Sequence, residues 1–266
     1  MSKWIAAFEE EISAHRAWLR ASGDHDRLSQ WDRRLQDQTE PSICEALVRH
    51  RLAKQVNTVL PAEDMAKGGP DFMCISGNSR FYVESTCMLI EAVTAATNLQ
   101  PKPTESGAVA WGPLTSKFLN ECRSKTTQCS VRKDGPCVLA ISTLHTVASS
   151  RCFTERMIGY ILTSEPLITG NFDANAGKVV GPLYQSTDWK KSAFVRISKA
   201  NPFFLEEASR SVSAMLLCGF GVDPPQIRGV IHPNPVRQFD AGLLPKFQFL
   251  QLVENADGTV KASVSR

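Results

Sequence analysis

The chain has 266 residues, of which 42% are hydrophobic and 21% are charged, and it carries a formal net charge of +3. These values are ordinary for a soluble globular protein with a substantial core, and a charge this small does not by itself indicate a nucleic-acid-binding protein. No segment approaches the roughly 20 continuous apolar residues of a membrane span, and the acidic residues 9–11 come too early for a signal peptide, so we expect a cytoplasmic protein without a membrane partner.

The N-terminal part of the chain predicts helices. Apolar side chains recur at helical spacing over residues 3–20, with charges between them, which indicates an amphipathic helix. Residues 22–40 are polar and charged around a tryptophan, and they predict either a second helix or a linker. A third helix is expected over residues 43–59 with Ser42 as its N-cap, because a proline and this serine precede an apolar run.

The next stretch predicts a β-hairpin. Two apolar runs, residues 71–75 and 80–87, flank a Gly-Asn pair. Glycine and asparagine tolerate the positive φ that a two-residue hairpin loop requires. With this loop, the residue numbers of facing residues sum to about 155. Asp71 then lies directly opposite Glu84.

An aspartate and a glutamate that face each other across two strands require a physical explanation. Their Cβ atoms would be roughly 4.5–5.5 Å apart, and two carboxylates at about 5 Å repel by roughly 3 kcal/mol at an effective dielectric constant near 20. Asp71 alone could be a turn residue, and Glu84 alone could be a solvated charge on an edge strand. The pair in this register favours a cation between the two side chains, and we expect metal to raise the melting temperature.

The rest of the chain predicts alternating helices and strands. Residues 88–113 indicate a short helix and then a loop, and residues 114–128 indicate another helix. A short buried strand is expected over residues 136–141, followed by a helix near residues 153–162 and a loop rich in glycine, asparagine and proline through about residue 188. Further strands are expected near residues 193–197, 212–218, 229–232 and 247–253. The order helix, hairpin, helix, strand, helix predicts an α/β fold in which helices flank a mixed sheet.

Polar side chains from other elements converge on the hairpin. Glu45 lies in the helix upstream of it, although alone it could be a surface charge. Thr86 points to the same sheet face as Glu84, because side chains alternate along a strand. On the helix after the hairpin, polar residues recur at intervals of four, four and three and form one stripe, unless this is a solvated face: Lys117, Glu121, Lys125 and Gln128.

This arrangement resembles the PD-(D/E)xK phosphodiesterase superfamily, which includes restriction endonucleases and many repair and defence nucleases. The resemblance covers roughly residues 40–145. The residues that carry it are Glu45, the Gly-Pro-Asp71 triplet and, after a turn, the segment Val-Glu84-x-Thr86.

The resemblance implies a restriction-endonuclease-like core with a mixed β-sheet flanked by helices, which we assign to residues 41–165. Residues 1–40 would then form a helical N-terminal extension. Residues 166–266 would form a β-rich C-terminal α/β extension that packs on the core. This last part carries no recognisable motif, and it could complete the sheet, contact substrate or form a homodimer.

The resemblance also implies a metal site. Asp71 and Glu84 would bind Mg²⁺ or Mn²⁺ together with the backbone carbonyl of Ser85, and Glu45 would support that metal through water or a second ion. Mg²⁺ prefers hard oxygen ligands and is usually held by one or two carboxylates and substrate phosphate. A bound ion of this kind lowers the pKa of a water and polarises the phosphoryl oxygen.

The sequence departs from the family pattern at Thr86, where the family has a lysine. In related proteins the next helix can supply the missing ammonium group. Lys125 is the candidate for this role and Lys117 is the second choice, while Gln128 could orient a phosphate or a water.

The resemblance predicts a metal-dependent nuclease, with DNA as the expected substrate. The alternative is a catalytically inactive relative that serves as a binding or scaffolding protein, and the threonine at position 86 favours it. A third interpretation is an unrelated α/β protein in which the motif is a coincidence.

Overall fold

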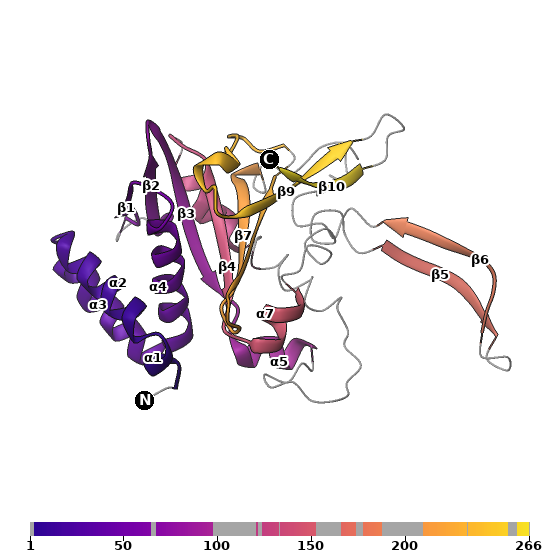
Figure 1. Ribbon diagram of the computed structural model, residues 1–266, viewed down its shortest axis with the longest axis horizontal. Coiled ribbons are helices and arrows are strands. Elements are labelled where there is room, and N and C mark those ends of the chain that lie inside the picture. The colour runs from indigo at the N-terminus through magenta and orange to yellow at the C-terminus, as the bar shows by residue number, and fades with distance from the viewer. Residues whose placement is uncertain are drawn as a thin grey trace.

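The computed structural model describes residues 3–64, 68–97, 121, 124–132, 134–152, 166–173, 178–187, 210–232, 234–254 and 260–265. Within these residues, N-terminal helices lie beside a mixed β-sheet, and shorter helices lie on the other side of the sheet (Figure 1). The α/β class predicted from the sequence is confirmed.

The chain begins with the helices α1 (Lys3–Ala7), α2 (Glu9–Ala21), α3 (His25–Asp37) and α4 (Thr39–Ala53). The single helix expected over residues 3–20 is divided at Phe8. The Asp24 carboxylate caps α3 by accepting a hydrogen bond from the backbone N–H of Arg27 at 2.9 Å. Trp31 is completely buried, so the segment that could have been a linker is a helix of the core.

Helix α4 begins at Thr39, before the start at Ile43 that the sequence predicted. Ser42 therefore lies inside the helix, where its hydroxyl donates a hydrogen bond to the Gln38 carbonyl at 3.1 Å. The prediction of Ser42 as the N-cap was wrong. Pro41 does not stop the helix, because the N–H that proline lacks would have no intrahelical partner in the first turn.

Helix α4 also ends earlier than predicted, at Ala53, and residues 58 and 59 belong to β1 (Thr58–Pro61). Asn57 fixes this change of direction. Its N–H donates to the carbonyl of Ile75 at 2.9 Å, and its side-chain oxygen accepts a hydrogen bond from the N–H of Gly77 at 2.8 Å. Strand pairing with the hairpin therefore replaces a further helical turn, which is a tertiary interaction that local sequence does not report.

Strands β2 (Phe72–Ser76) and β3 (Ser79–Cys87) form the predicted hairpin. They pair in antiparallel fashion, with Ser76 facing Ser79 and Phe72 facing Val83, which is the register that the Gly-Asn loop predicts. Gly77 has a φ of 57°, in the left-handed region that glycine adopts without strain. The predicted strand bounds are shifted by one residue at the loop and at the start of β2.

Within the described residues, eight strands form one mixed sheet in the order β1-β2-β3-β4-β7-β8-β9-β10. Strands β3, β4 and β7 run parallel to one another. The strands after the hairpin are β4 (Cys137–Thr143), β7 (Val212–Gly219), β8 (Gln226–Ile231), β9 (Gln248–Glu254) and β10 (Val260–Ser265). The first four correspond to predicted strands. The strand expected near residues 193–197 and the helix expected near residues 153–162 lie outside the described residues.

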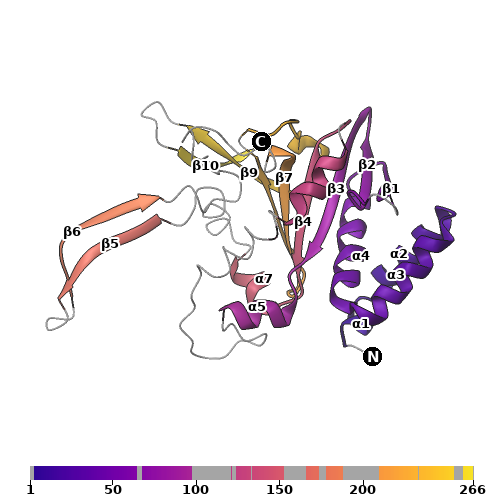
Figure 2. The same ribbon diagram turned by 180° about the vertical axis from the view of Figure 1, so that it is seen from behind.

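Two hydrophobic clusters cover the two faces of the sheet. Phe81 and Val83 of β3 pack with α2, α3 and α4, whereas Tyr82 packs in the second cluster. That second cluster includes residues of α5 (Ile90–Thr97) and α7 (Thr146–Cys152), and Figure 2 shows these two helices on the side of the sheet away from α2, α3 and α4.

None of the described helices is long and apolar enough to cross a membrane.

The loop expected through about residue 188 is in part a β-ribbon, so this prediction was wrong. Strands β5 (Pro166–Asp173) and β6 (Lys178–Thr187) pair with each other in antiparallel fashion. The glycines, asparagine and prolines of this segment suggested a loop. In the structure they lie within strands, and the strand register shifts between Thr169 and Asn171. A glycine within a strand often marks such a bulge. The ribbon points away from the main sheet (Figure 1).

Candidate active site

Asp71 and Glu84 are neighbours at the end of the hairpin. Asp71 precedes Phe72, which faces Val83, so the strand register continues to Glu84 on the opposite strand. The Oδ2 atom of Asp71 accepts a hydrogen bond from the backbone N–H of Ser85 at 2.7 Å. The aspartate is therefore held across the strand, beside the glutamate.

Lys125 reaches Glu84 from the helical residues 124–131, which follow the hairpin. Its Nζ atom donates a hydrogen bond to Oε1 of Glu84 at 2.9 Å. The glutamate side chain is 1% exposed and the lysine side chain is 25% exposed. The other oxygen of Glu84, Oε2, is buried and has no hydrogen-bond partner among the described residues. One oxygen of this buried carboxylate is therefore available for a further cation or a donor.

The polar stripe on this helical segment faces β3, as its spacing predicts. Glu121 accepts a hydrogen bond from the Thr86 hydroxyl at 3.1 Å, while Lys125, one turn further on, contacts Glu84. Side chains four residues apart on the helix thus contact side chains two residues apart on the strand, because both spacings place the side chains on one face of their element. Gln128 continues the same stripe and is half-buried. Lys117 lies outside the described residues.

Glu45 approaches Asp71 from the other side, on helix α4. Its Oε2 atom accepts a hydrogen bond from Nη2 of Arg34 at 2.9 Å, and its Oε1 atom lies 3.7 Å from Nε2 of His15. The Asp71 charge is felt by both Glu45 and Glu84. Asp71 is therefore the middle member of a row of three carboxyl groups.

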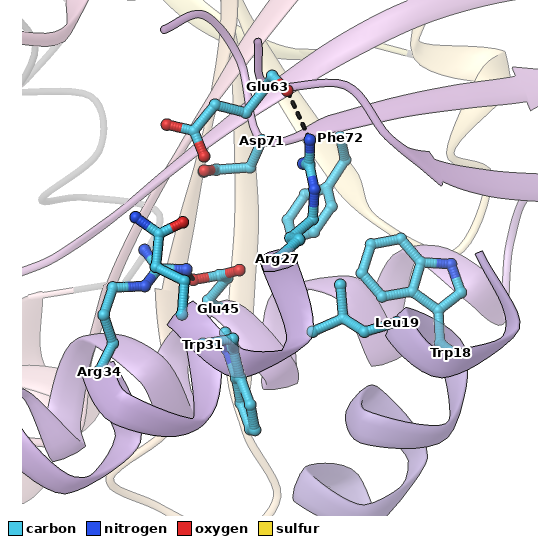
Figure 3. Close-up of a pocket in the computed structure, with 10 residues that line it drawn as sticks. Trp18, Leu19, Arg27, Trp31, Arg34, Glu45, Glu63, Asp71 and Phe72 are labelled. Carbon is cyan, nitrogen blue, oxygen red and sulfur yellow. Dashed lines mark hydrogen bonds and ion pairs between the residues drawn. The ribbon is translucent and has the colours of Figure 1, made fainter. Parts of the chain in front are cut away.

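A narrow recess separates Glu45 from Asp71, as Figure 3 shows. Glu63 also lines it, and its carboxylate lies next to that of Asp71. Arg27 holds this segment in place by donating a hydrogen bond to the backbone carbonyl of Glu63 at 2.6 Å. The free volume of the recess is about 10 Å³, which is roughly the space of one water molecule. The recess fits a single ion or water and excludes a nucleotide.

Burial raises the pKa of all three carboxyl groups in the row. Loss of solvation, and then the Asp71 charge, raise the pKa of Glu45 and that of Glu84 to about 8. Loss of solvation raises the pKa of Asp71 to about 6, although the hydrogen bond from Ser85 opposes this change. Burial by itself lowers the pKa of Lys125, but the Glu84 carboxylate outweighs this effect and raises it. Glu45 and Glu84 therefore keep their protons at neutral pH unless a further cation joins them.

His15 does not supply the missing positive charge. Burial, and then the nearby charges of Arg49 and Arg34, lower the pKa of its imidazole to about 3. The ring is completely buried and stacks on Trp31 with a centroid distance of 4.6 Å. The histidine beside Glu45 is therefore neutral.

The donor set fits a divalent ion in part. Carboxylate oxygens are the ligands that Mg²⁺ and Mn²⁺ prefer, and the buried, unpartnered Oε2 of Glu84 is an oxygen of this kind. However, no group of three or more histidine, cysteine, aspartate and glutamate side chains in the described part of the chain is arranged to hold a metal ion. Within the described residues, the arrangement therefore offers a single ion no more than two of these side chains.

Three residues of the site were not predicted from the sequence: His15, Arg34 and Glu63. Arg34 belongs to a polar segment whose charges are typical of a solvated surface, and Glu63 follows a strand that was not predicted, since its first two residues were assigned to a helix. His15 carried a usable signal, because it lies between Ile12 and Leu19 at the helical spacing of the buried face.

The chain matches no family model, no curated protein and no solved structure. The superfamily resemblance therefore stays a prediction from the sequence.

Proposed function

We propose that the protein is a phosphodiesterase that cleaves nucleic acid, most simply DNA, with the help of Mg²⁺ or Mn²⁺. The observation that carries this proposal is the pair of the partly buried Asp71 and the buried Glu84, which lie side by side with an ammonium group 2.9 Å from Glu84. Burial raises the pKa of both groups, and the Asp71 charge raises that of Glu84 further, which is typical of a functional site.

The order of elements around the pair supports the same proposal. A helix with Glu45 precedes the hairpin, a helical segment with Lys125 follows it, and the buried parallel strand β4 comes next. This order agrees with the restriction-endonuclease-like core that the resemblance implies for residues 41–165, with α1–α3 outside it.

In this proposal each group of the chain has a distinct role. Asp71 and Glu84 would hold the ion, which would supply a lower pKa for a bound water and polarisation of the phosphoryl oxygen. Lys125 stabilises the negative charge that develops on the phosphorane. Thr86 cannot take the part of the family lysine, because it is uncharged and its hydroxyl donates to Glu121. Since the recess beside Glu45 holds only a water-sized species, the substrate approaches from the Lys125 side.

Plasmid cleavage tests the proposal. Purified protein is incubated with supercoiled DNA and millimolar Mg²⁺ or Mn²⁺, and nicked and linear products are measured by gel electrophoresis. Asp71→Asn and Glu84→Gln keep the side-chain volume but remove the charge, so we expect each to reduce cleavage by at least about 100-fold.

Asp134→Asn is the matched control, because this carboxylate is exposed and pairs with Arg80 at 2.8 Å, away from the site. It should cleave as the unchanged protein does. Cleavage by Asp71→Asn or Glu84→Gln at the rate of the control would remove the site from the reaction.

One observation favours an inactive binding protein as the second candidate. Position 86 carries no ammonium group, and Lys125 already forms an ion pair with Glu84. An inactive relative would bind Mn²⁺ or DNA without turnover. If binding is measured and no cleavage occurs with either metal, this second function replaces the first.

A further inference from the structure

A second pocket lies between the last turn of α4, the start of β8 and the segment before β9. Its volume is about 280 Å³, which is close to the lower end of the range for small-molecule sites. None of the described residues that line it is acidic, and half of them are basic: Arg51, Lys54, Arg228 and Lys246.

Hydrogen bonds hold the cations of this basic pocket together. The backbone N–H of Lys246 donates to the side-chain oxygen of Gln55 at 2.9 Å, and the Lys246 ammonium donates to the backbone carbonyl of Lys54 at 3.0 Å. These bonds fasten the segment before β9 to the end of α4. Among the described residues, nothing else bonds to the Lys54 side chain or to the other two ammonium hydrogens of Lys246, so these are left for a ligand.

No acidic residue among the described lining residues neutralises the two arginines of the pocket, Arg51 and Arg228. Within the part of the chain that the structure describes, the buried Nε atoms of Arg51 and Arg228 have no hydrogen-bond partner. Arg228 uses Nη1 to donate to the carbonyl of Ile227 at 3.2 Å. Basic residues in the last turn of a helix often stabilise the helix dipole, and this explains Arg51. It does not explain Arg228 and Lys246, which belong to other elements.

The remaining wall of the basic pocket is apolar. Ile227, Phe247 and Pro225 line it, and each is partly exposed. Apolar walls with a few convergent charged groups are typical of sites for small organic ligands. An aromatic ring next to a cationic groove also suits a nucleobase, which can stack on it.

We propose that this pocket binds a nucleotide through its phosphate. Arginine and lysine together recognise phosphate oxygens, the guanidinium by paired hydrogen bonds and the ammonium as a point charge. The base lies against Ile227 and Phe247. The nucleotide is either free or the end of a strand, and both sources present the same chemistry. The pocket is formed by residues other than the acidic row, so the proposal does not depend on nuclease activity.

Calorimetric titrations in EDTA, without divalent metal, test this proposal and leave the acidic site out of the measurement. The ligands are adenosine diphosphate, a 5′-phosphorylated dinucleotide and inorganic phosphate. We expect saturable binding of at least one of the first two with a Kd below about 1 mM, and weaker binding of inorganic phosphate. Tighter binding of adenosine diphosphate indicates a free nucleotide, and tighter binding of the dinucleotide indicates a strand end.

Substitutions place the binding in the pocket. Arg228→Gln/Lys246→Gln should weaken it by at least 10-fold, whereas Arg20→Gln/Arg33→Gln removes two exposed arginines elsewhere and should change it less than 2-fold. Lys54→Gln changes only an exposed side chain, so the chain should fold normally, and binding should weaken at least 3-fold. Three results would each overturn the proposal: no saturation at about 5 mM ligand, equal binding of inorganic phosphate, or unchanged affinity in Lys54→Gln. These concentrations and ratios are about the limits that calorimetry resolves.

Discussion

Helix α4 contributes to two charged regions of opposite character. Near its middle, Glu45 belongs to a buried row of carboxyl groups with Asp71 and Glu84. At its end, Arg51 and Lys54 belong to a pocket of cations that no described carboxylate neutralises. The difference is solvation. Buried carboxylates oppose folding until a cation joins them, whereas cations on long, partly exposed stems stay hydrated and affect stability little. The acidic row should therefore respond to pH and metal through folding, and the basic pocket should respond only to its ligand.

The largest effect should follow removal of the cation in the acidic row. Lys125→Met leaves Glu84 buried without its partner, so we expect a loss of about 3 kcal/mol of unfolding free energy above about pH 8, where Glu84 is charged. Adding Glu84→Gln should restore most of it, because no charge is then left unpaired. Urea denaturation measures both variants. Lys54→Met is the matched change in the basic pocket, and we expect less than about 0.5 kcal/mol there. Equal losses at the two lysines would contradict the comparison.

The acidic row should make the metal-free protein less stable as pH rises. The folded pKa values of Asp71, about 6, and of Glu45 and Glu84, about 8, lie above the ordinary values of 3.8 and 4.5. Between these limits the folded state binds more protons than the unfolded state, so the unfolding free energy falls with rising pH. The unfolding free energy is highest at pH values below the ordinary carboxyl pKa values and lowest above about pH 8.

The change in the pKa of Asp71 from 3.8 to about 6 corresponds by itself to a fall of about 3 kcal/mol across this window, measured by urea denaturation in EDTA. Saturating Mn²⁺ competes with the protons and should flatten the curve, so its thermal stabilisation should be larger at high pH. Stability that rises with pH in EDTA would show that the carboxyl groups are well compensated in the folded state.

A change remote from both charged regions separates their effects from those of the fold. Gly77→Ala introduces a side chain at a φ of 57°, with no atom within 4 Å of the new Cβ. We expect a loss of about 1 kcal/mol from backbone strain alone. The pH dependence and metal response should be those of the unchanged protein. A change in either would mean that the loop also sets the geometry of the acidic pair.

The smallest effect concerns the partner of Glu45. Arg34 is 39% exposed, so solvent screens its ion pair, and Arg34→Gln should lower stability by about 0.5 kcal/mol. The loss should appear above about pH 8, where Glu45 is charged, and vanish near pH 5, where it is protonated. Arg33→Gln, an exposed neighbour, is the control. A loss of the same size at both pH values would indicate a packing effect.

The sequence predicted the hairpin because its signals are local. A Gly-Asn pair between apolar runs specifies both the turn and the register, and the register specifies which residues face each other. The stripe with Glu121 and Lys125 was predictable for the same reason, since helical spacing alone places both side chains over β3. These two local patterns account for Asp71, Glu84 and Lys125.

The rest of the site depends on contacts between distant segments. The first two residues of β1, 58 and 59, were predicted as the end of a helix, because only pairing with β2 makes them a strand. Glu63 follows that strand and was missed with it. Arg34 resembles any solvated helix charge until α3 packs beside α4. The basic pocket is the extreme case, because the bond between Lys246 and Gln55 joins residues 191 positions apart.

Titration of the protein with Mn²⁺ by calorimetry, in two buffers of different ionisation enthalpy at about pH 7.5, tests the metal pair most directly. A pair of carboxyl groups with raised pKa must release protons when the ion binds. We predict one saturable site with proton release, and its loss in Asp71→Asn/Glu84→Gln. No binding at millimolar Mn²⁺, or equal binding by the double variant, would contradict the proposed site.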